Sequence, residues 1–276
     1  MGRRGGGCAP RRAPPCGAAK LPAVSASLRT VTATRYVLPL REGGSLPGLL
    51  EADDDGLYVT KLRGAGQGDG ALVAEVIAGE LARALGLPVP ELVLVTGASA
   101  FAQAEPDPEI QELLAASPDP NVGMDFLPGA LPFALPPDPP LDAALAADVV
   151  WLDALVTNVD RTHRNPNLLC WHGRTWLIDH GAAFFRQHGP APLRDTAAAP
   201  VPQLADHVLL PVAGPIAEAD ERLAARARDA VDAVVALAPD AWLGADPPER
   251  RADFAAFLHE RLSTRTFVEE AERARG

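Results

Sequence analysis

Asn158-Val-Asp160-Arg-Thr-His-Arg-Asn165-Pro-Asn167 is the stretch of this chain that decides the fold. An apolar run, residues 168–170, follows it, and a Gly173-Arg turn then leads to a second apolar run, residues 176–178. Asp179-His-Gly181 closes the pattern. This order predicts a helix before the stretch, then a loop, a strand, a turn, a second strand and another loop. Two carboxylates and an amide are therefore expected at one edge of a short hairpin.

These side chains suit phosphoryl transfer. Asp160 lies five residues before Asn165, and a carboxylate there can orient or deprotonate an attacking hydroxyl. Asn165 and Asp179 offer the hard oxygen ligands that Mg²⁺ prefers, with phosphate and water completing its coordination. Arg161, together with His163 and Arg164, is expected to add positive charge beside the phosphates. A plain turn is the alternative, because Asp, Asn and Pro gather in turns of every kind.

The first half of the chain predicts a compact set of strands. Strand-forming residues occupy 30–37, 49–52, 57–61 and 91–96, separated by turns. Lys61 ends the third of these strands, from where its ammonium can reach the phosphates of ATP. Before the second strand, Gly43, Gly44 and Ser45 could cover the phosphates with backbone N–H groups.

Residues 71–85 carry apolar side chains at helical spacing and end at a capping glycine, Gly86. Two glutamates lie on this expected helix. Either Glu75 or Glu80 is expected to pair with Lys61 and hold it against the phosphates, and we favour Glu75. A strand over 123–127 then places Met124, Asp125 and Phe126 where backbone groups would bind adenine.

Composition sets the remaining bounds. The net charge of −11 makes a broad nucleic-acid surface unlikely, and no apolar run is long enough to cross a membrane. Three cysteines form neither a metal-binding spacing nor a disulfide framework, which fits a reducing cytoplasm. Residues 1–28 are rich in Gly, Ala, Pro and Arg and are expected to form a disordered extension.

The predicted fold class is α+β with two lobes. Residues 29–122 form the small β-rich lobe with one helix, and residues 123–276 form the hinge and a larger helical lobe. Helices are expected over 141–156, 215–237, 248–262 and 266–275, with irregular chain between 186 and 202. Pro215 and Pro248 fit first helical turns, where a missing N–H costs little.

With these motifs described, the chain resembles the HipA-like kinases, a bacterial branch with a protein-kinase-like fold. The resemblance rests on Tyr58-Val-Thr-Lys61, on residues 75–91, on residues 158–165 and on Ile178-Asp-His-Gly181. The block around Asp160 is also similar to that of phosphatidylinositol 3- and 4-kinases.

The resemblance implies ATP- and Mg²⁺-dependent phosphoryl transfer. By it Lys61 would bind phosphate, Asp160 would be the catalytic base, and Asn165 and Asp179 would bind the metal, with Asn158 supporting the loop. Two motifs depart from protein kinases, because Asn-Val-Asp replaces His-Arg-Asp and Asp-His-Gly replaces Asp-Phe-Gly. HipA toxins pair with a DNA-binding antitoxin, and no feature of this sequence indicates such a partner.

The acceptor stays open at this point. A Ser/Thr protein kinase is the leading interpretation, and a lipid or small-molecule kinase is the first alternative. The second is a nucleotide-binding pseudokinase that serves as an interaction module. A structural protein without a nucleotide site is the last.

Overall fold

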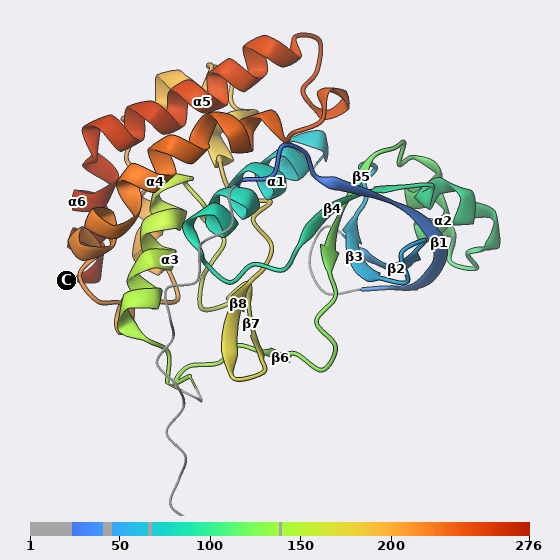
Figure 1. The fold of residues 1–276 in the computed structure, drawn as a ribbon, viewed down its shortest axis with the longest axis horizontal. Helices are drawn as coiled ribbons and strands as arrows, with labels where there is room; N and C mark the ends of the chain where they lie inside the picture. Colours follow the sequence, from blue (N-terminus) through green and yellow to red (C-terminus); the bar gives the residue numbers. More distant parts are fainter. Residues whose placement is uncertain (1–23, 41–45, 66–67, 138–139) are drawn as a thin grey trace, which may run out of the picture.

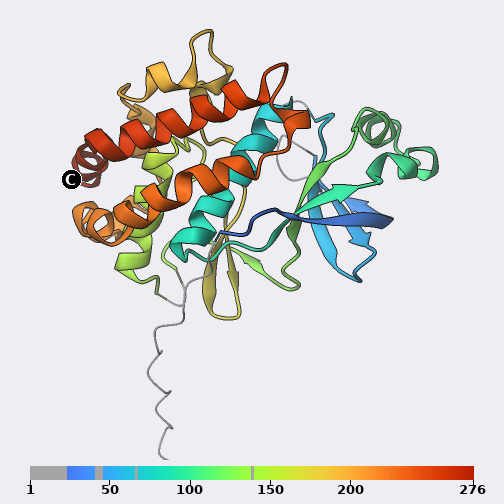
Figure 2. The same cartoon turned by 45° about the horizontal axis from the view of Figure 1, so that its top comes forward.

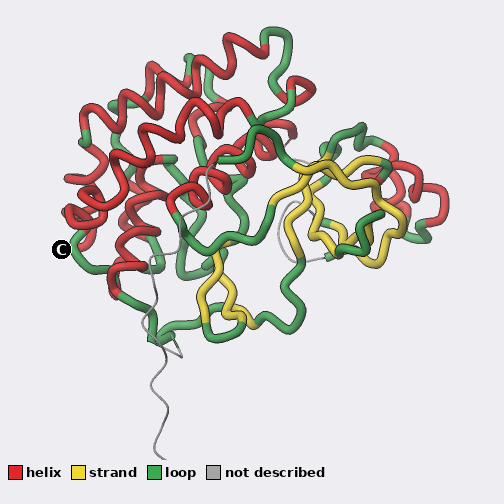
Figure 3. Tube along the Cα trace, viewed as in Figure 1, coloured by secondary structure: helices red, strands yellow, loops and turns green. Residues whose placement is uncertain are grey.

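The computed structural model describes residues 24–40, 46–65, 68–137 and 140–276. Its strands and helices separate into two parts, with a β-barrel at one end and a helical bundle at the other (Figures 1 and 3). The predicted α+β class is therefore confirmed. The predicted Gly43-Gly44-Ser45 loop, and all but the last five residues of the predicted extension, lie outside the described residues.

Five strands close the barrel in the order β1-β2-β3-β5-β4. The pairings are antiparallel except that of β1 with β4. Alternation along β3 buries Tyr58 and Thr60, while Val59 and Lys61 lie on the other face. The strands are β1 (Arg29–Pro39), β2 (Gly48–Ala52), β3 (Leu57–Lys61), β4 (Leu92–Thr96) and β5 (Asn121–Asp125).

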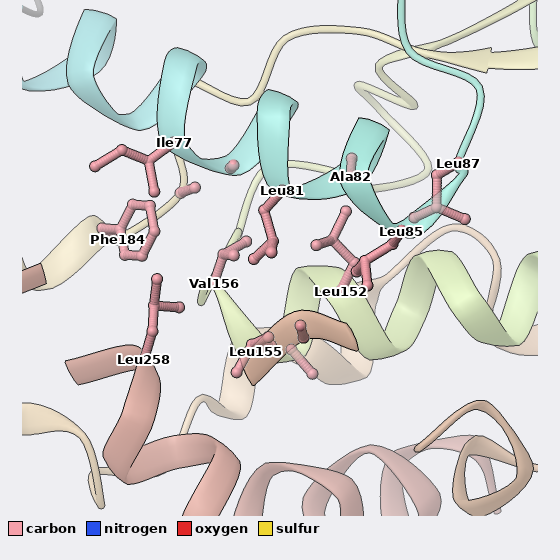
Figure 4. Close-up of a cluster of buried hydrophobic side chains, with 14 of the residues drawn as sticks. Ile77, Leu81, Ala82, Leu85, Leu87, Leu152, Leu155, Val156, Phe184 and Leu258 are labelled. Carbon is pink, nitrogen blue, oxygen red and sulfur yellow. The ribbon is translucent and has the colours of Figure 1, made fainter. Parts of the chain in front are cut away.

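Helix α1 (Gly68–Leu85) connects β3 to β4, and most of its residues are buried. Its apolar side chains belong to the core of the helical part, whereas a separate, smaller cluster fills the barrel. Figure 4 shows Leu81 and Leu85 of α1 facing Leu152 and Leu155 of α3 (Ala143–Leu155). The helix that carries Glu75 is therefore fixed to the helical part by hydrophobic packing, although the chain enters and leaves it through barrel strands. A second, short helix, α2 (Pro108–Ala115), lies between β4 and β5 in the sequence.

The helical part is completed by α4 (Ile216–Ala236), α5 (Pro247–Thr264) and α6 (Thr266–Arg275), close to their predicted positions. Pro215 lies at the N-cap of α4, and Pro247 and Pro248 begin α5 behind the capping carboxylate of Asp246. Helix α4 packs against α1 and α5 packs on α4, and the second view shows α4 and α5 side by side (Figure 2). Between residues 185 and 212 the chain forms four short 3₁₀ turns.

A small sheet lies below the barrel and the bundle (Figure 1). It contains β6 (Leu131–Pro132), β7 (Leu168–Trp171) and β8 (Arg174–Leu177) in that order. His172 and Gly173 both have positive φ, the conformation of a tight two-residue hairpin turn. The predicted hairpin is thus present, and the short strand β6 is an addition that the sequence pattern did not indicate. Within the described ranges, none of the helices combines the length and apolar character needed to traverse a bilayer.

Candidate active site

A cleft of about 770 Å³ lies between the barrel and the helical part. The barrel contributes the outward face of β3 and part of β5, and the helical part contributes the loop after α3 and the turn after β8. Its wall includes eight residues singled out from the sequence: Lys61, Glu75, Met124, Asp125, Phe126, Asp160, Asn165 and Asp179.

The Lys61 ammonium lies between two carboxylates. Lys61 Nζ is 2.5 Å from Glu75 Oε2 and 2.5 Å from Asp179 Oδ1. The pair expected between Lys61 and Glu75 is therefore present, and Glu80 instead contacts Arg83. Because the Lys61 side chain is mostly shielded from water, these charges interact more strongly than they would on the surface.

The pKa values of this group follow from burial and charge. Burial alone would lower the pKa of Lys61, but the attraction of Glu75 and Asp179 outweighs it and raises the pKa. Burial alone would raise the pKa of Glu75, but Lys61 and a hydrogen bond from His180 lower it to about 2. Lys61 and Glu75 are therefore both charged throughout the neutral range.

The loop after α3 holds Asp160 at the cleft wall. Asp160 Oδ2 accepts hydrogen bonds from Asn165 Nδ2 at 2.6 Å and from Asn167 Nδ2 at 3.4 Å. The backbone N–H of Asp160 donates to Asn158 Oδ1 at 3.2 Å. Asp160 Oδ1 has no hydrogen-bond partner among the described residues, so this oxygen can accept from a hydroxyl in the cleft.

A fully buried ion pair lies beneath this loop. Arg161 Nε donates to Asp153 Oδ2 at 2.5 Å, and His207 Nε2 lies 2.9 Å from the same oxygen. Asn158 Nδ2 donates to the other oxygen, Asp153 Oδ1, at 3.0 Å. Because Leu209 N–H donates to His207 Nδ1, His207 carries its proton on Nε2 and donates it to Asp153.

This ion pair corrects one expectation from the sequence and adds two residues to the site. Arg161 was expected beside the phosphates, but it is 1% exposed and its guanidinium also donates to the carbonyl oxygens of Asn167 and Ile178. Asp153 and His207 were not singled out at all. Asp153 and Asp148 interrupt the apolar residues of α3, and a charge in so apolar a helix was the available signal.

Asp179 lies in a strained turn. Its φ of 54° falls in the left-handed region that non-glycine residues seldom adopt. Two residues on, a Cβ at Gly181 would stand 3.1 Å from Lys61 Nζ. The glycine of Asp179-His-Gly181 therefore leaves room for the ammonium that Asp179 binds.

The expected adenine-binding segment spans the end of β5 and the residue after it, and part of its backbone is already hydrogen-bonded. The N–H groups of Asp125 and Phe126 donate to Glu91 O and Leu57 O, each at 2.9 Å. Neither can therefore donate to a base. The N–H of Leu127, a buried residue that also lines the cleft, has no partner among the described residues.

The oxygens around Asp160 fit a hard divalent cation. Asn165 donates through Nδ2, which leaves its Oδ1 as a neutral ligand, and Asp179 uses Oδ1 for Lys61, which leaves Oδ2. Mg²⁺ needs few protein ligands when phosphate and water complete its octahedron. Across the described ranges no group of three or more His, Cys, Asp or Glu is placed to hold a metal ion.

Comparison with known proteins agrees with this fold. A model of the HipA-like kinase family matches residues 35–267, and the chain belongs to that family. The crystal structure of a Helicobacter pylori proinflammatory kinase, CtkA, is similar with a TM-score of 0.54. The match covers 92% of this chain and 98% of that one at 13% sequence identity, so it concerns the fold. A search of curated proteins found no match.

Proposed function

We propose that this chain is an ATP- and Mg²⁺-dependent kinase that phosphorylates a hydroxyl group, with Ser or Thr of a protein as the acceptor. The observation that supports it is the convergence of Lys61, Asp160 and Asp179 on one cleft from three distant parts of the sequence. Family membership supports the use of ATP. The choice of a protein acceptor rests on the family resemblance.

Each residue has a role that its contacts support. Lys61, held by Glu75, would bind the phosphates, and Asp160 Oδ1 would orient the attacking hydroxyl and accept its proton. Asn165 and Asp179 would hold the metal, which when bound neutralises phosphate charge. Catalysis would then come from positioning and charge neutralisation rather than from a covalent intermediate.

Adenine would occupy the apolar end of the cleft. Val59, Leu92, Met124, Leu169 and Ile178 line it. The free N–H of Leu127 would serve as the donor to the base, in place of the committed N–H groups of Asp125 and Phe126. The three residues expected from the sequence would then contact the nucleotide through side chains and carbonyl oxygens.

Removal of either carboxylate tests the proposal. We expect Asp160→Ala and Asp179→Ala to lower transfer of labelled γ-phosphate by at least about 10³-fold, with the far-UV circular dichroism spectrum unchanged. Asp229→Ala is the matched control, because Asp229 is exposed on α4 outside the cleft lining. Unaltered phosphorylation by both cleft variants would refute the assignment.

An acceptor screen separates the alternatives. Wild-type protein is incubated with Mg²⁺ and labelled ATP together with Ser/Thr peptides, lipid headgroups or small alcohols. Label on peptides supports the proposal, whereas label confined to lipids or small molecules replaces the acceptor. If MgATP raises the melting temperature but neither these acceptors, the protein itself nor water takes phosphate, the chain is a nucleotide-binding pseudokinase.

A further inference from the structure

His180, the middle residue of Asp179-His-Gly181, is fully buried and contacts Glu75 twice. Its backbone N–H donates to Glu75 Oε2 at 2.9 Å, and its Nδ1 lies 3.4 Å from Glu75 Oε1. Lys61 Nζ shares Oε2 with that backbone N–H. Both oxygens of the glutamate that holds Lys61 are thus bound, one of them by the His180 side chain.

The imidazole of His180 lies against α1 at Gly79. Gly79 lies one turn beyond Glu75, and a Cβ there would be 3.7 Å from His180 Nδ1 and only 2.7 Å from Leu92 Cδ1. The bare backbone at Gly79 therefore lets Leu92 of β4 approach α1 closely, beside the imidazole of His180.

The contact with Glu75 determines where the imidazole carries its proton. An ionised carboxylate accepts hydrogen bonds and donates none, so Nδ1 must carry the hydrogen. His180 Nε2 is buried and has no partner in the described part of the chain. A bare nitrogen there costs less than an unsatisfied buried N–H, which favours the tautomer with its hydrogen on Nδ1.

We propose that His180 is a positioning residue for phosphoryl transfer. Its Nδ1–H fixes Glu75 Oε1, so that Oε2 stays directed at the Lys61 ammonium beside Asp179. Without that bond only the contacts at Oε2, from Lys61 and from the His180 backbone N–H, would hold the Glu75 carboxylate, whose terminal torsion is broad and roughly two-fold. This role rests on the proposed kinase activity. It also gives a chemical use to the histidine that stands in place of the phenylalanine of protein kinases.

Matched substitutions at His180 test the role. Asn keeps a donor near the Nδ1 position, while Leu and Phe fill the space without one. We expect His180→Leu and His180→Phe to lower kcat by about 10- to 100-fold with a smaller change in KM for ATP, and His180→Asn to stay within about three-fold of wild type. His259→Phe is the control, since His259 is partly exposed on α5 and paired with Asp232.

A double-mutant cycle with Glu75→Gln asks whether His180 acts through Glu75. If it does, adding His180→Leu to Glu75→Gln should lower kcat by less than about three-fold further. A full, independent loss in that background would overturn the proposal, and so would an Asn variant no better than the Leu variant.

A measurement without nucleotide separates this proposal from the kinase assignment. Imidazole ¹⁵N spectra of the free protein should show one histidine protonated on Nδ1 and bare on Nε2, whose signals vanish in His180→Asn and shift in Glu75→Gln. A His180 protonated on Nε2 alone would overturn the proposal. A wild-type protein that shows the expected spectrum but transfers no phosphate would instead contradict the proposed function.

Discussion

Arg161 shows at the scale of one residue why a charge in a loop sequence is hard to interpret. It follows the candidate catalytic Asp160 directly, yet its side chain points inward to Asp153 and to two backbone carbonyls. Burying a lone carboxylate costs several kcal/mol, so Asp153 requires this partner. The pair fixes the backbone on which Asp160 and Asn167 lie.

Substitution of Arg161 is therefore expected to destabilise the protein. Arg161→Met leaves Asp153 buried without its cation and should lower the free energy of unfolding by about 3–5 kcal/mol, measured by urea denaturation. Arg164→Met, on the exposed side of the same loop, should change it by less than about 0.5 kcal/mol. Equal, small losses in the two variants would contradict a buried structural role for Arg161.

At the scale of elements, the C-terminal end of α3 carries the catalytic loop and is held by α5. Arg261 of α5 donates to Leu155 O at 2.9 Å and to Ala154 O at 2.7 Å. It also donates to Ala197 O, in the irregular chain before α4, at 2.7 Å. The last turn of a helix leaves its carbonyls without partners inside the helix. A cation there is also attracted to the negative end of the helix dipole. Burial lowers the pKa of Arg261 to about 10, so it remains charged at neutral pH.

Loss of this contact should loosen the end of α3. We expect Arg261→Met to lower the free energy of unfolding by about 2–4 kcal/mol, because three carbonyls lose a buried charged donor. Amide hydrogen exchange should rise first in residues 152–160. Arg273→Met, exposed on α6, is the matched control. Unchanged exchange in the loop after α3 would show that Arg261 does not stabilise it.

The arrangement of the whole molecule places Glu75 and Asp153 on helices of one common core. Helix α1 packs with α3 and α4, and Arg226 of α4 donates to Ala84 O at the end of α1. The barrel is tied to this core through Arg63, which donates to Ala241 O, and through Trp242, which donates to Pro120 O. Movement of α1 away from Lys61 would therefore disrupt the main core. We expect the Lys61–Glu75 ion pair to form without a separate activation step.

Acid should weaken the fold through these two carboxylates. Despite burial, Lys61 lowers the pKa of Glu75, and Arg161 lowers that of Asp153. At a pH between the lowered pKa of the folded state and the ordinary pKa of the unfolded state, the unfolded chain binds more protons than the folded one. The stabilisation from these carboxylates is therefore complete above about pH 5 and is lost as the pH falls toward 2. Urea unfolding of wild type at pH 7, 5, 4 and 3 should show the loss.

The variants Glu75→Gln and Asp153→Asn isolate the effect from the other acidic groups. Each variant should have a lower free energy of unfolding than wild type at pH 7. As the pH falls, this difference should shrink by about 1.4 kcal/mol for each unit by which folding lowers the pKa of the replaced carboxylate. A constant difference from pH 7 to pH 3 would mean that these carboxylates do not drive acid unfolding.

Much of the local structure follows from the sequence because it depends on neighbours in the chain. Runs of strand-forming residues and helical apolar patterns located β3, α1, the β7–β8 hairpin and the last three helices, and Asp160, Asn165 and Asp179 were singled out by residue type and spacing. The strand end at Lys61 and a glutamate on the helix that follows likewise predicted the pair that the structure contains. Such features need no knowledge of what packs above or below them.

The tertiary structure alone decided which way charged side chains point and which core a helix joins. Arg161 turned inward because Asp153 is buried beneath it, and α1 joined the helical core because its side chains are apolar on most faces. The same holds for His180, whose partner Glu75 lies 105 residues away in the sequence. The physical reason is that burial and ion pairing are set by residues far apart in the chain, whose meeting no local pattern encodes.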